Sequence, residues 1–401
     1  MDIANADEVR NGRVDQGRPR LRILAPSMAL DPLGGVEICT LQDSVALAGR
    51  GHHIDMLYGS DGSLRPIYES AGVGLFGPYS FALDKRRPIR TLRDFAPAAK
   101  VARDRQPDVL WLNRFEHIVW GQIVARWAGC PIVCHLHGPP MYRRLREVSR
   151  GVAHFIAVSE FIRDAYIAGG LQPERISLVY NAIPQRQYPF GTVEDQRSAR
   201  RALRLPEDAR LVLCYGQLSP DKGVPSLLKA WRMISSTNPK AILVLVDSMA
   251  SDESSALEES VAQELRQLDP KSYRRFPMTS NVVPFLHASD VVVFPTLLQE
   301  AFGRVVIEGM ATGRPVVASR TGAVPEILSG PMARFLVEPN APDELAAKLG
   351  SVLRWRDDEP ELGEKCAHWV KQMFPFGRHV DQLEDILQRH RRRSAPRQHA
   401  G

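Results

Sequence analysis

The stretch RLVLCYGQLSPDKGVPSLLKAWRMI, residues 210–234, contains the three parts of a pattern that repeats along the whole chain. A short aliphatic run, RLVLCYG, leads into a polar loop that contains proline and glycine. A segment follows whose apolar residues recur at helical spacing. A buried strand, a loop and a covering helix in this order are typical of parallel sheets with crossover helices. The stretch therefore predicts an α/β fold.

Short apolar runs of the same kind lie on both sides of this stretch. Six precede it and four follow it, at residues 21–27, 53–59, 108–113, 131–137, 154–159, 176–181, 241–247, 290–295, 314–319 and 333–338. Helical patterns fill the intervals, among them residues 35–50, 90–105, 224–234 and 343–355. A chain of 401 residues is too long for one core of ordinary size. We expect two consecutive doubly wound domains.

The segment QRQYPFGTVEDQRSAR, residues 185–200, interrupts this alternation, because it is polar and has no apolar periodicity. We interpret it as a linker or domain boundary. A Pro-Phe-Gly break at 375–377 precedes a last helical pattern. The predicted parts are a disordered tail at 1–19, a Rossmann-like domain at 20–187 that also takes the last helix at 377–391, a second Rossmann-like domain at 188–376, and a basic tail at 392–401.

The composition is that of an ordinary globular protein, with 44% hydrophobic and 24% charged residues. The net charge of +6 is compatible with an anionic ligand or an acidic membrane surface, and it does not call for nucleic acid. Five scattered cysteines indicate reduced core thiols. The first twenty residues hold no apolar leader, and no apolar run reaches the ~20 residues that span a bilayer. We therefore expect a cytoplasmic protein.

The loop PLGGVE, residues 32–37, leaves the first apolar run and opens a helix. Its adjacent glycines, Gly34 and Gly35, let the backbone approach a ligand closely and offer N–H groups at a positive helix end. The loop is not the GxGxxG dinucleotide pattern, and GxxxxGK[ST] is absent from the sequence. An ordinary tight turn between strand and helix remains the alternative.

The loop HLHGPP, residues 135–140, ends another run. Alternation along a strand places His135 and His137 on one face. A metal site would need a third ligand, and none stands at a suitable spacing, so we expect no metal. His137, next to Gly138, is better placed as a hydrogen-bond donor to a ligand.

The loop YGQLSPDKG, residues 215–223, opens the helix that follows the first run of the second half. Lys222 stands at the start of that helix, where its ammonium and free backbone donors can together hold a phosphate. A surface lysine in a turn is the alternative.

The stretch QEAFGRVVIEGM, residues 299–310, places one glutamate on each side of a glycine turn. Gly303 and Arg304 fall at the start of a short helix, a favourable place for an anion. Glu300 lies in the preceding loop, and Glu308 lies about one turn inside an otherwise apolar helix. A buried carboxylate needs partners, and sugar or ribose hydroxyls are suitable ones. A helix-capping acid for Glu300, and an exposed helix position for Glu308, remain equally open alternatives to ligand binding.

Taken together, these loops resemble the retaining GT-B glycosyltransferases of the large family 4 type. The resemblance rests on an ordered set that runs from about residue 21 to 390: GGVE, HLHG, VSEFIRD (158–164), VYNAIP (179–184), YGQLSPDKG, EAFGRVVIE (300–308) and EGMATGRPVVASRTGAVPEIL (308–328). Each motif is weak by itself, whereas the ordered set is specific.

The resemblance implies a cleft between two Rossmann-like domains, with a nucleotide-sugar donor held mainly by the second and the acceptor mainly by the first. It implies transfer of a hexosyl-type sugar with retention of configuration. Uridine is the commonest donor base in this family. No cofactor or metal is expected, and the sequence contains no Asp-x-Asp pair.

By position in the motifs, Glu308 would bind the ribose hydroxyls and Glu300 would contact the donor sugar. Lys222 and backbone N–H groups near Phe302 and Gly303 would hold the diphosphate. His137 would lie near the reacting sugar, and Gly35 would close over the phosphates. The resemblance thus implies Glu300, His137 and Lys222 as catalytic residues, and Gly35, Gly216, Gln217, Lys222, Glu300, Phe302, Gly303, Arg304 and Glu308 as donor-binding residues.

The sequence departs from the family pattern at two places. Gln217 stands where the family usually has arginine, and losing one charge-assisted contact costs about 1.5–3 kcal/mol. Arg304 or Arg320 could replace it. The run AILVLVD is followed by SMASDES, where a glycine-rich turn is common in the family.

Two other functions fit parts of the sequence. A nucleotide-sugar epimerase shares the two-domain architecture but lacks the ordered loop set, and a catalytically silent nucleotide-sugar-binding module would explain Gln217. The acceptor remains open among glycans, lipid-linked compounds and small natural products. Arginine clusters are either solvated helix faces or contacts for an anionic acceptor or, weakly, for a membrane; they are Arg86, Arg87, Arg90 and Arg93, and Arg143, Arg144, Arg146 and Arg150.

Overall fold

The structure of the protein is a computed structural model that describes residues 19–84, 86–247 and 254–392. The chain divides into two compact units. The six-stranded unit is Ala182–Phe376, and the seven-stranded unit takes the described residues of Asp2–Asn181 and Gly377–Gly401. The two predicted tails lie almost wholly outside the described residues, as does most of the SMASDES segment.

The seven-stranded unit contains an entirely parallel sheet of order β3-β2-β1-β4-β5-β6-β7. Its strands are β1 (Arg22–Ala29), β2 (His53–Ser60), β3 (Gly74–Phe76), β4 (Val109–Leu112), β5 (Ile132–Leu136), β6 (His154–Ala157) and β7 (Ile176–Leu178). All six predicted runs of this half are strands. The short β3 was not predicted.

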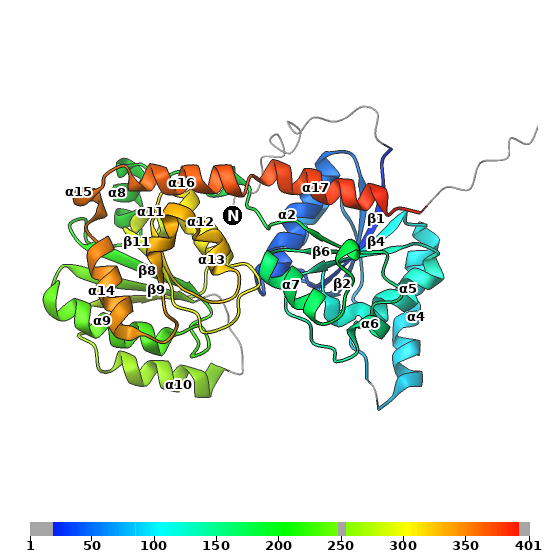
Figure 1. Cartoon of the computed structure of the whole chain (residues 1–401), viewed down its shortest axis with the longest axis horizontal. Coiled ribbons are helices and arrows are strands. Elements are labelled where there is room, and N and C mark those ends of the chain that lie inside the picture. Colours follow the sequence, from blue (N-terminus) through cyan, green and yellow to red (C-terminus); the bar gives the residue numbers. More distant parts are fainter. Residues whose placement is uncertain (1–18, 85, 248–253, 393–401) are drawn as a thin grey trace, which may run out of the picture. The chain divides into compact units, whose positions relative to one another are not determined.

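Helices cover both faces of this sheet (Figure 1). They are α2 (Gly35–Gly49), α3 (Arg65–Ser70), α4 (Pro88–Arg105), α5 (Ile118–Ala128), α6 (Leu145–Val148), α7 (Glu160–Ala168) and α17 (Phe376–Arg389), with 3-10 turns η1 (Phe115–His117) and η2 (Pro173–Arg175). The helices from α2 to α7 each connect one strand to the next, as parallel pairing requires, whereas α17 comes from the end of the chain.

Polar side chains attach the C-terminal helix α17 to the beginning of this unit. Glu384 accepts hydrogen bonds from Arg50 at 2.6 Å and from His52 Nε2 at 3.0 Å. His52 Nδ1 accepts from the Leu21 amide, so the proton of this imidazole lies on Nε2. One turn earlier, His379 bonds Asp43 at 2.9 Å. These buried contacts explain why the last helix of the chain belongs with the first strands.

The six-stranded unit contains a second parallel sheet, of order β10-β9-β8-β11-β12-β13. Its strands are β8 (Arg210–Gly216), β9 (Ala241–Asp247), β10 (Tyr273–Phe276), β11 (Val291–Phe294), β12 (Val316–Ser319) and β13 (Leu336–Val337). The five predicted runs are again strands. The edge strand β10 was not predicted, and β13 is shorter than its run because a 3-10 turn, η4 (Gly330–Phe335), takes the first part.

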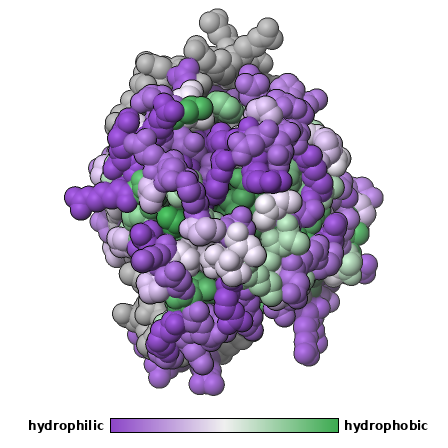
Figure 2. All heavy atoms as spheres, turned by 90° about the vertical axis from the view of Figure 1, so that its left-hand side faces the viewer, coloured by the Kyte–Doolittle hydropathy of each residue, from purple (hydrophilic) through white to green (hydrophobic). Residues whose placement is uncertain are grey.

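Helices surround this sheet as well (Figure 1). They are α8 (Val193–Ala202), α9 (Val224–Thr237), α10 (Ser254–Leu265), α11 (Val283–Ala288), α12 (Arg304–Ala311), α13 (Val324–Ile327), α14 (Pro342–Val352), α15 (Trp355–Asp358) and α16 (Leu362–Met373), and a 3-10 turn, η3 (Gln185–Gln187), opens the unit. On the side drawn in Figure 2 the surface is mostly hydrophilic and broken by small apolar patches. Of the described helices, none has the length and apolarity to cross a membrane.

The interpretation of residues 185–200 as a linker is wrong for its second half, which forms α8. Thr192 and Asp195 make a capping box at the start of this helix. The helix faces the core with polar residues, Gln196 and Arg200, which are 8% and 4% exposed. Because its buried face is polar, α8 shows no apolar periodicity in the sequence.

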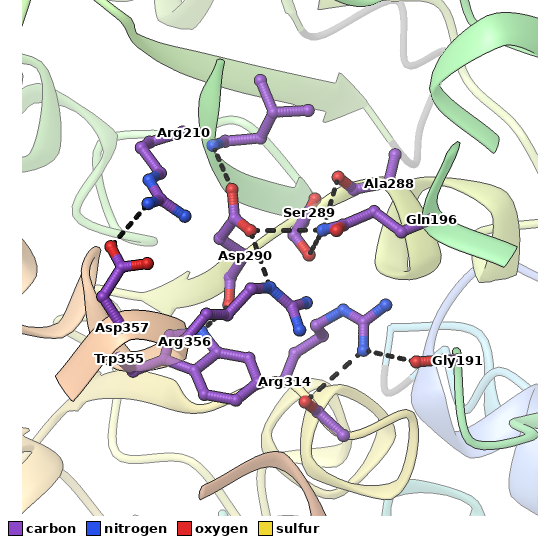
Figure 3. Close-up of polar contacts among 12 residues, drawn as sticks. Gly191, Gln196, Arg210, Ala288, Ser289, Asp290, Arg314, Trp355, Arg356 and Asp357 are labelled. Atoms are coloured by element: carbon purple, nitrogen blue, oxygen red, sulfur yellow. Dashed lines mark hydrogen bonds and ion pairs between the residues drawn. The ribbon is translucent and has the colours of Figure 1, made fainter. Parts of the chain in front are cut away.

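Asp290, just before β11, is the partner that makes this burial possible. Its carboxylate accepts from Arg200 at 2.9 Å and from the Leu211 amide at 2.8 Å. It also accepts from Gln196 at 3.2 Å and Arg356 at 3.1 Å (Figure 3). Asp290 itself is 1% exposed. A buried charge with this many donors is a fixed part of the fold.

In each unit the strand order reverses beside the first strand, between β1 and β4 and between β8 and β11. In open parallel sheets a ligand binds beyond the carboxyl ends of the strands at such a switch point. The loops after these four strands are therefore the places where functional side chains are expected.

Candidate functional site

The loops that follow β8 and β11 are joined directly in the six-stranded unit. The Leu297 amide donates to the carbonyl of Asp221 at 2.9 Å. Gly223 has φ +73°, and a Cβ at this position would come within 1.9 Å of the Pro295 carbonyl oxygen. Both the backbone conformation and the close approach require glycine here. The two loops therefore form one compact edge.

A third loop, which follows β12, packs against the same edge. The Ala323 amide donates to the Glu300 carbonyl at 2.9 Å, and the Gly322 amide donates to the Gln299 side chain at 3.0 Å. A Cβ on Gly322 would lie 2.2 Å from the Glu300 carbonyl oxygen. The loop that carries Glu300 is thus held between two others, which fixes its backbone.

Lys222 and Glu300, predicted as catalytic residues, meet across these loops. Lys222 Nζ lies 2.5 Å from Glu300 Oε1. Thr296 donates its hydroxyl to the same carboxylate oxygen at 3.0 Å. The Lys222 side chain is 27% exposed and that of Glu300 is 17% exposed. The pair is therefore ordered by its partners and still open to a ligand.

The helix α12 begins at the same edge. Gly303 precedes it with φ +106°, and no side chain caps its first turn. Uncapped N–H groups at a helix start attract an anion. The prediction that Gly303 and Arg304 fall at a helix start is confirmed. The Phe302 ring is buried against Phe374, so Phe302 offers a ligand its backbone only.

Glu308 lies one turn inside α12, where neighbouring side chains hold its carboxylate. Tyr215 donates to Oε2 at 2.8 Å, and Arg304 donates to Oε1 at 3.1 Å. The side chains of Glu308 and Arg304 are 9% and 10% exposed. Burial, followed by the charge of Glu308, raises the pKa of Tyr215 well above its usual value, so this phenol keeps its proton. The alternative that Glu308 is an exposed position on an amphipathic helix is therefore excluded.

A second tyrosine, Tyr188, lies in the same cluster. It is 5% exposed. Burial and then the Glu308 charge raise its pKa, and its hydroxyl contacts both Arg304 and Glu308. The sequence analysis missed Tyr188, Tyr215 and Thr296 as site residues. Tyr215 and Thr296 could have been found from their places at the ends of apolar runs, whereas Tyr188 lies in the segment interpreted as a linker.

The remaining predicted donor-binding residues of this unit differ in their surroundings. Gly216 ends β8 with φ +119°, and Gln217 is exposed beside it. Arg320, one of two candidate replacements for the usual arginine, pairs at 3.0 Å with the exposed Glu338. Arg304, the other candidate, lies at the start of α12 beside Glu308.

The seven-stranded unit has a pocket at its own switch point. It is lined by Val36 of α2, residues 113–116 after β4, residues 137–139 after β5, Met141, and Tyr166 of α7. His137 is thus part of a pocket wall, as a ligand-contacting role requires. Gly35, next to Val36, is the first residue of α2 and has no left-handed backbone conformation.

An ion pair that the sequence analysis missed borders this pocket. Arg114 Nη2 lies 2.5 Å from Glu37 Oε1, and Glu37 is 2% exposed. With Glu116 also in the lining, carboxylates balance the arginine charge. Arg114 and Glu116 could have been found from their place directly after an apolar run. The pocket suits a neutral, hydroxyl-bearing group better than an anion.

The two histidines of HLHG lie close together, with ring centroids 4.3 Å apart. His135 is fully buried, and burial holds its pKa well below the usual value, so it is neutral. Among the residues that the structure describes, no group of three histidine, cysteine or acidic side chains could hold a metal ion. His135 is therefore a core residue, and His137 is the member of the pair that reaches a pocket.

Both units match models of glycosyltransferase families. Residues 33–187 match Glycosyltransferase Family 4, and residues 195–372 match Glycosyl transferases group 1. Over 276 residues the chain is 26% identical to the lipopolysaccharide 1,2-N-acetylglucosaminetransferase of Salmonella typhimurium, covering 67% of this chain and 70% of that protein.

A second relative is a GDP-mannose-dependent mannosyltransferase of Corynebacterium glutamicum that acts on monoacylated alpha-(1-6)-phosphatidylinositol monomannoside. It is 25% identical over 307 residues, 72% of this chain and 78% of its own length. The crystal structure of Anabaena HepE in complex with UDP and glucose resembles the chain with a TM-score of 0.81 and 22% identity, over 92% of this chain and 100% of that one. The structural likeness establishes a GT-B fold.

Proposed function

The chain belongs to the GT-B glycosyltransferases of group 1, which use nucleotide-sugar donors, and we propose that it transfers a hexosyl-type sugar with retention of anomeric configuration. The observation that carries the proposal is the pair of carboxylate–cation contacts at one edge of the six-stranded unit. Lys222 lies against Glu300, and Arg304 lies against Glu308. Both pairs stand beside an uncapped helix start.

This edge has the chemistry to hold the two ends of a nucleotide sugar. Glu308 accepts hydrogen bonds from the ribose hydroxyls, because a carboxylate has lone pairs to spare beyond those used by Tyr215 and Arg304. Glu300 accepts from hydroxyls of the donor sugar. Between them, Lys222 and the N–H groups at the start of α12 bind the diphosphate.

The chemical step follows from where charge develops. When the bond between the anomeric carbon and the phosphate oxygen breaks, negative charge grows on the diphosphate and positive charge grows on the sugar ring. Lys222 leaves Glu300 for the phosphate and, with the α12 helix start, stabilises the leaving group. Glu300 then carries an unpaired negative charge near the cationic sugar. The acceptor hydroxyl attacks the anomeric carbon from the same face and gives its proton to the departing phosphate oxygen.

Gln217 stands where the family usually has an arginine, and we assign the role of that arginine in donor binding to Arg304. It already lies at the start of α12, whereas Arg320 is engaged with Glu338 on the surface. Arg304→Ala should weaken donor binding by roughly tenfold or more, since a hydrogen bond to a charged group contributes about 1.5–3 kcal/mol. Arg320→Ala is the matched control, and an equal effect of both variants would contradict the assignment.

The seven-stranded unit supplies the acceptor side in this proposal. Its pocket contains His137, which donates a hydrogen bond to a sugar hydroxyl, and Gly35 lies at the adjoining helix start. The balanced charge of the pocket favours a hydroxyl-bearing acceptor group. The cytoplasmic location and the independence of metal stay predictions.

The donor base is proposed to be uridine. HepE was crystallised with UDP and glucose, which supports this choice, while the mannosyltransferase relative is described as GDP-mannose-dependent. The experiment is a screen of purified protein with UDP-, GDP-, ADP- and TDP-sugars, following release of nucleoside diphosphate with and without acceptor extracts. NMR of the product anomer then reports retention, and repetition with EDTA reports metal dependence.

The expected result is acceptor-dependent release from one UDP-sugar, lost in Lys222→Ala and in Glu308→Ala. Release that needs no acceptor but yields an isomerised sugar would indicate an epimerase. Donor binding without turnover of any donor would favour the silent module, for which Gln217 is the specific observation.

A further inference from the structure

The first two turns of α4 stand out from the seven-stranded unit. Of residues 88–95, only Thr91 and Phe95 are buried. In Figure 1 this end of the helix projects beyond the neighbouring α6. Two large apolar side chains are exposed on it, Ile89 at 70% and Leu92 at 53%. They are three residues apart and therefore lie on one side of the helix.

Positive charge surrounds these apolar side chains. The described residues 86–94 contain four arginines against one aspartate, a net charge of +3. Arg86, Arg87 and Arg93 are exposed, and their guanidinium groups form no ion pair within the part of the chain that the structure describes; only the Arg86 amide bonds a carboxylate, that of Asp84 at 2.8 Å. Apolar groups that project between unpaired arginines are what an anionic lipid surface binds, through charge first and then through burial of the apolar groups.

A second basic segment, residues 141–150, adjoins the first. Met141 is 70% exposed, and Arg143, Arg144 and Arg146 are exposed behind it. The second segment, and the loop that leads into the first, contact residues that follow β4. Before α4, Phe81 packs its ring on Trp120 at 4.8 Å, and Tyr142 donates to the Glu116 carbonyl at 3.2 Å.

The position of the two segments relates them to the pocket of the same unit. They follow β3 and β5, and the carboxyl ends of parallel strands meet at one edge of a sheet. Met141, at the start of the second segment, also lines the pocket that contains His137. Met141 therefore connects this edge of the sheet to the pocket, and Ile89 and Leu92 belong to the segment that begins at the same edge.

We propose that this edge of the seven-stranded unit, with Ile89, Leu92 and Met141 exposed among arginines, docks the protein on an anionic lipid surface. A soluble polyanion would use the arginines but gives no reason for exposed isoleucine and leucine beside them. A second copy of the chain would bring arginine against arginine in a two-fold interface. The proposal does not depend on the transfer reaction, because docking is a property of the surface alone.

The test is co-flotation of the full chain with vesicles of phosphatidylcholine alone and with vesicles containing roughly a third phosphatidylglycerol. The wild type should bind the anionic vesicles only, and less at high salt. Ile89→Asp/Leu92→Asp should reduce the bound fraction, and Arg86→Glu/Arg87→Glu/Arg93→Glu should reduce affinity by roughly tenfold or more, because each arginine near the surface contributes. Thermal melting and nucleotide binding of each variant should match the wild type, which shows that it is folded.

The chain offers a matched control on the same unit. Arg126 and Trp127 are likewise an exposed basic and apolar pair, Trp127 at 53%, but they stand at the far end of α5. Arg126→Glu/Trp127→Asp should leave vesicle binding unchanged. The proposal is overturned if the wild type does not float with anionic vesicles, or if the control variant loses as much binding. It is also overturned if the arginine variant loses only binding to a soluble polyanion such as heparin.

Discussion

The strand β11 has a carboxylate near each end, and the two differ in how many protein donors they accept from. At its amino end, Asp290 is 1% exposed and accepts from four protein donors. Beyond its carboxyl end, the side chain of Glu300 is 17% exposed and accepts from Lys222 and Thr296. Both carboxylates are ordered, but only the second leaves room for another partner.

The difference separates a structural carboxylate from one that can bind a ligand. The donors to Asp290 come from several elements, and Trp355 also donates to its backbone carbonyl at 2.8 Å. Replacing any of them leaves a buried charge unsatisfied. Glu300 and Glu308 each pair with one cation, Lys222 or Arg304, near the loops at the carboxyl ends of the strands. A ligand can take the place of that cation as partner of the carboxylate. Position relative to the sheet, rather than residue type, decides the role.

The largest effect is expected at Asp290, at the amino end of β11, and it is an effect on stability. Asp290→Asn removes the charge that compensates Arg200 and Arg356 in the interior, and we expect a loss of about 3–5 kcal/mol in unfolding free energy. Chemical denaturation measures it. The control is Asp208→Asn, since Asp208 and Lys240 form a surface pair with both side chains more than 70% exposed. Surface pairs typically contribute below about 1 kcal/mol. A loss that small for Asp290→Asn would contradict the structural role assigned to Asp290.

At the other end, Lys222→Met should act on the reaction and leave the fold intact. Removing one preorganised group that stabilises developing charge typically lowers kcat by about 10²–10³. Release of nucleoside diphosphate at saturating donor measures this. Lys229, exposed on α9 in the same unit, provides the control variant Lys229→Met. An unchanged kcat in Lys222→Met would mean that the pair with Glu300 is structural, like that of Asp290.

A smaller effect is expected for Glu308→Gln, which should weaken donor binding by roughly 10–100-fold because a charged hydrogen-bond acceptor contributes about 1.5–3 kcal/mol. Its loss of unfolding free energy should be smaller than that of Asp290→Asn, since Glu308 has fewer protein partners. Calorimetric titration with UDP measures the binding, and Glu338→Gln on the exposed surface is the control. Greater loss of stability than of affinity would place Glu308 in the structural class.

The smallest expected effect is that of Tyr215→Phe. It removes one hydrogen bond to Glu308 while the ring remains, and such a bond contributes about 0.5–1.5 kcal/mol. Donor affinity should fall by a few-fold in the same titration. No change at all would indicate that Tyr215 only fills space, and a loss as large as that of Glu308→Gln would show that the tyrosine sets the position of the carboxylate.

Much of the architecture could be predicted because short apolar runs in the sequence mark the buried strands. Every apolar run that was expected to be a strand is one, since a strand buried on both faces must be aliphatic along its whole length. The strands missed, β3 and β10, are short edge strands with one neighbour each. They bury too little to leave a clear apolar run.

The helix α8 could not be predicted from the residues around it. Its buried face carries Gln196 and Arg200, and polar residues can be buried only when a partner satisfies them. That partner, Asp290, lies about ninety positions further along the chain. No window of sequence around α8 contains this information, so the helix was interpreted as a linker.

For the proposed site, the sequence alone predicted which loops belong to it, because motif order and strand ends are local properties of the chain. It left open whether Lys222, Glu300 and Glu308 were surface residues or members of one edge. Only the tertiary structure decided this, by pairing β8 with β11 so that their loops meet. The same pairing brought Tyr188, Tyr215 and Arg304 around Glu308. Contacts between distant segments depend on how strands are ordered in the sheet, and that order is a property of the whole fold.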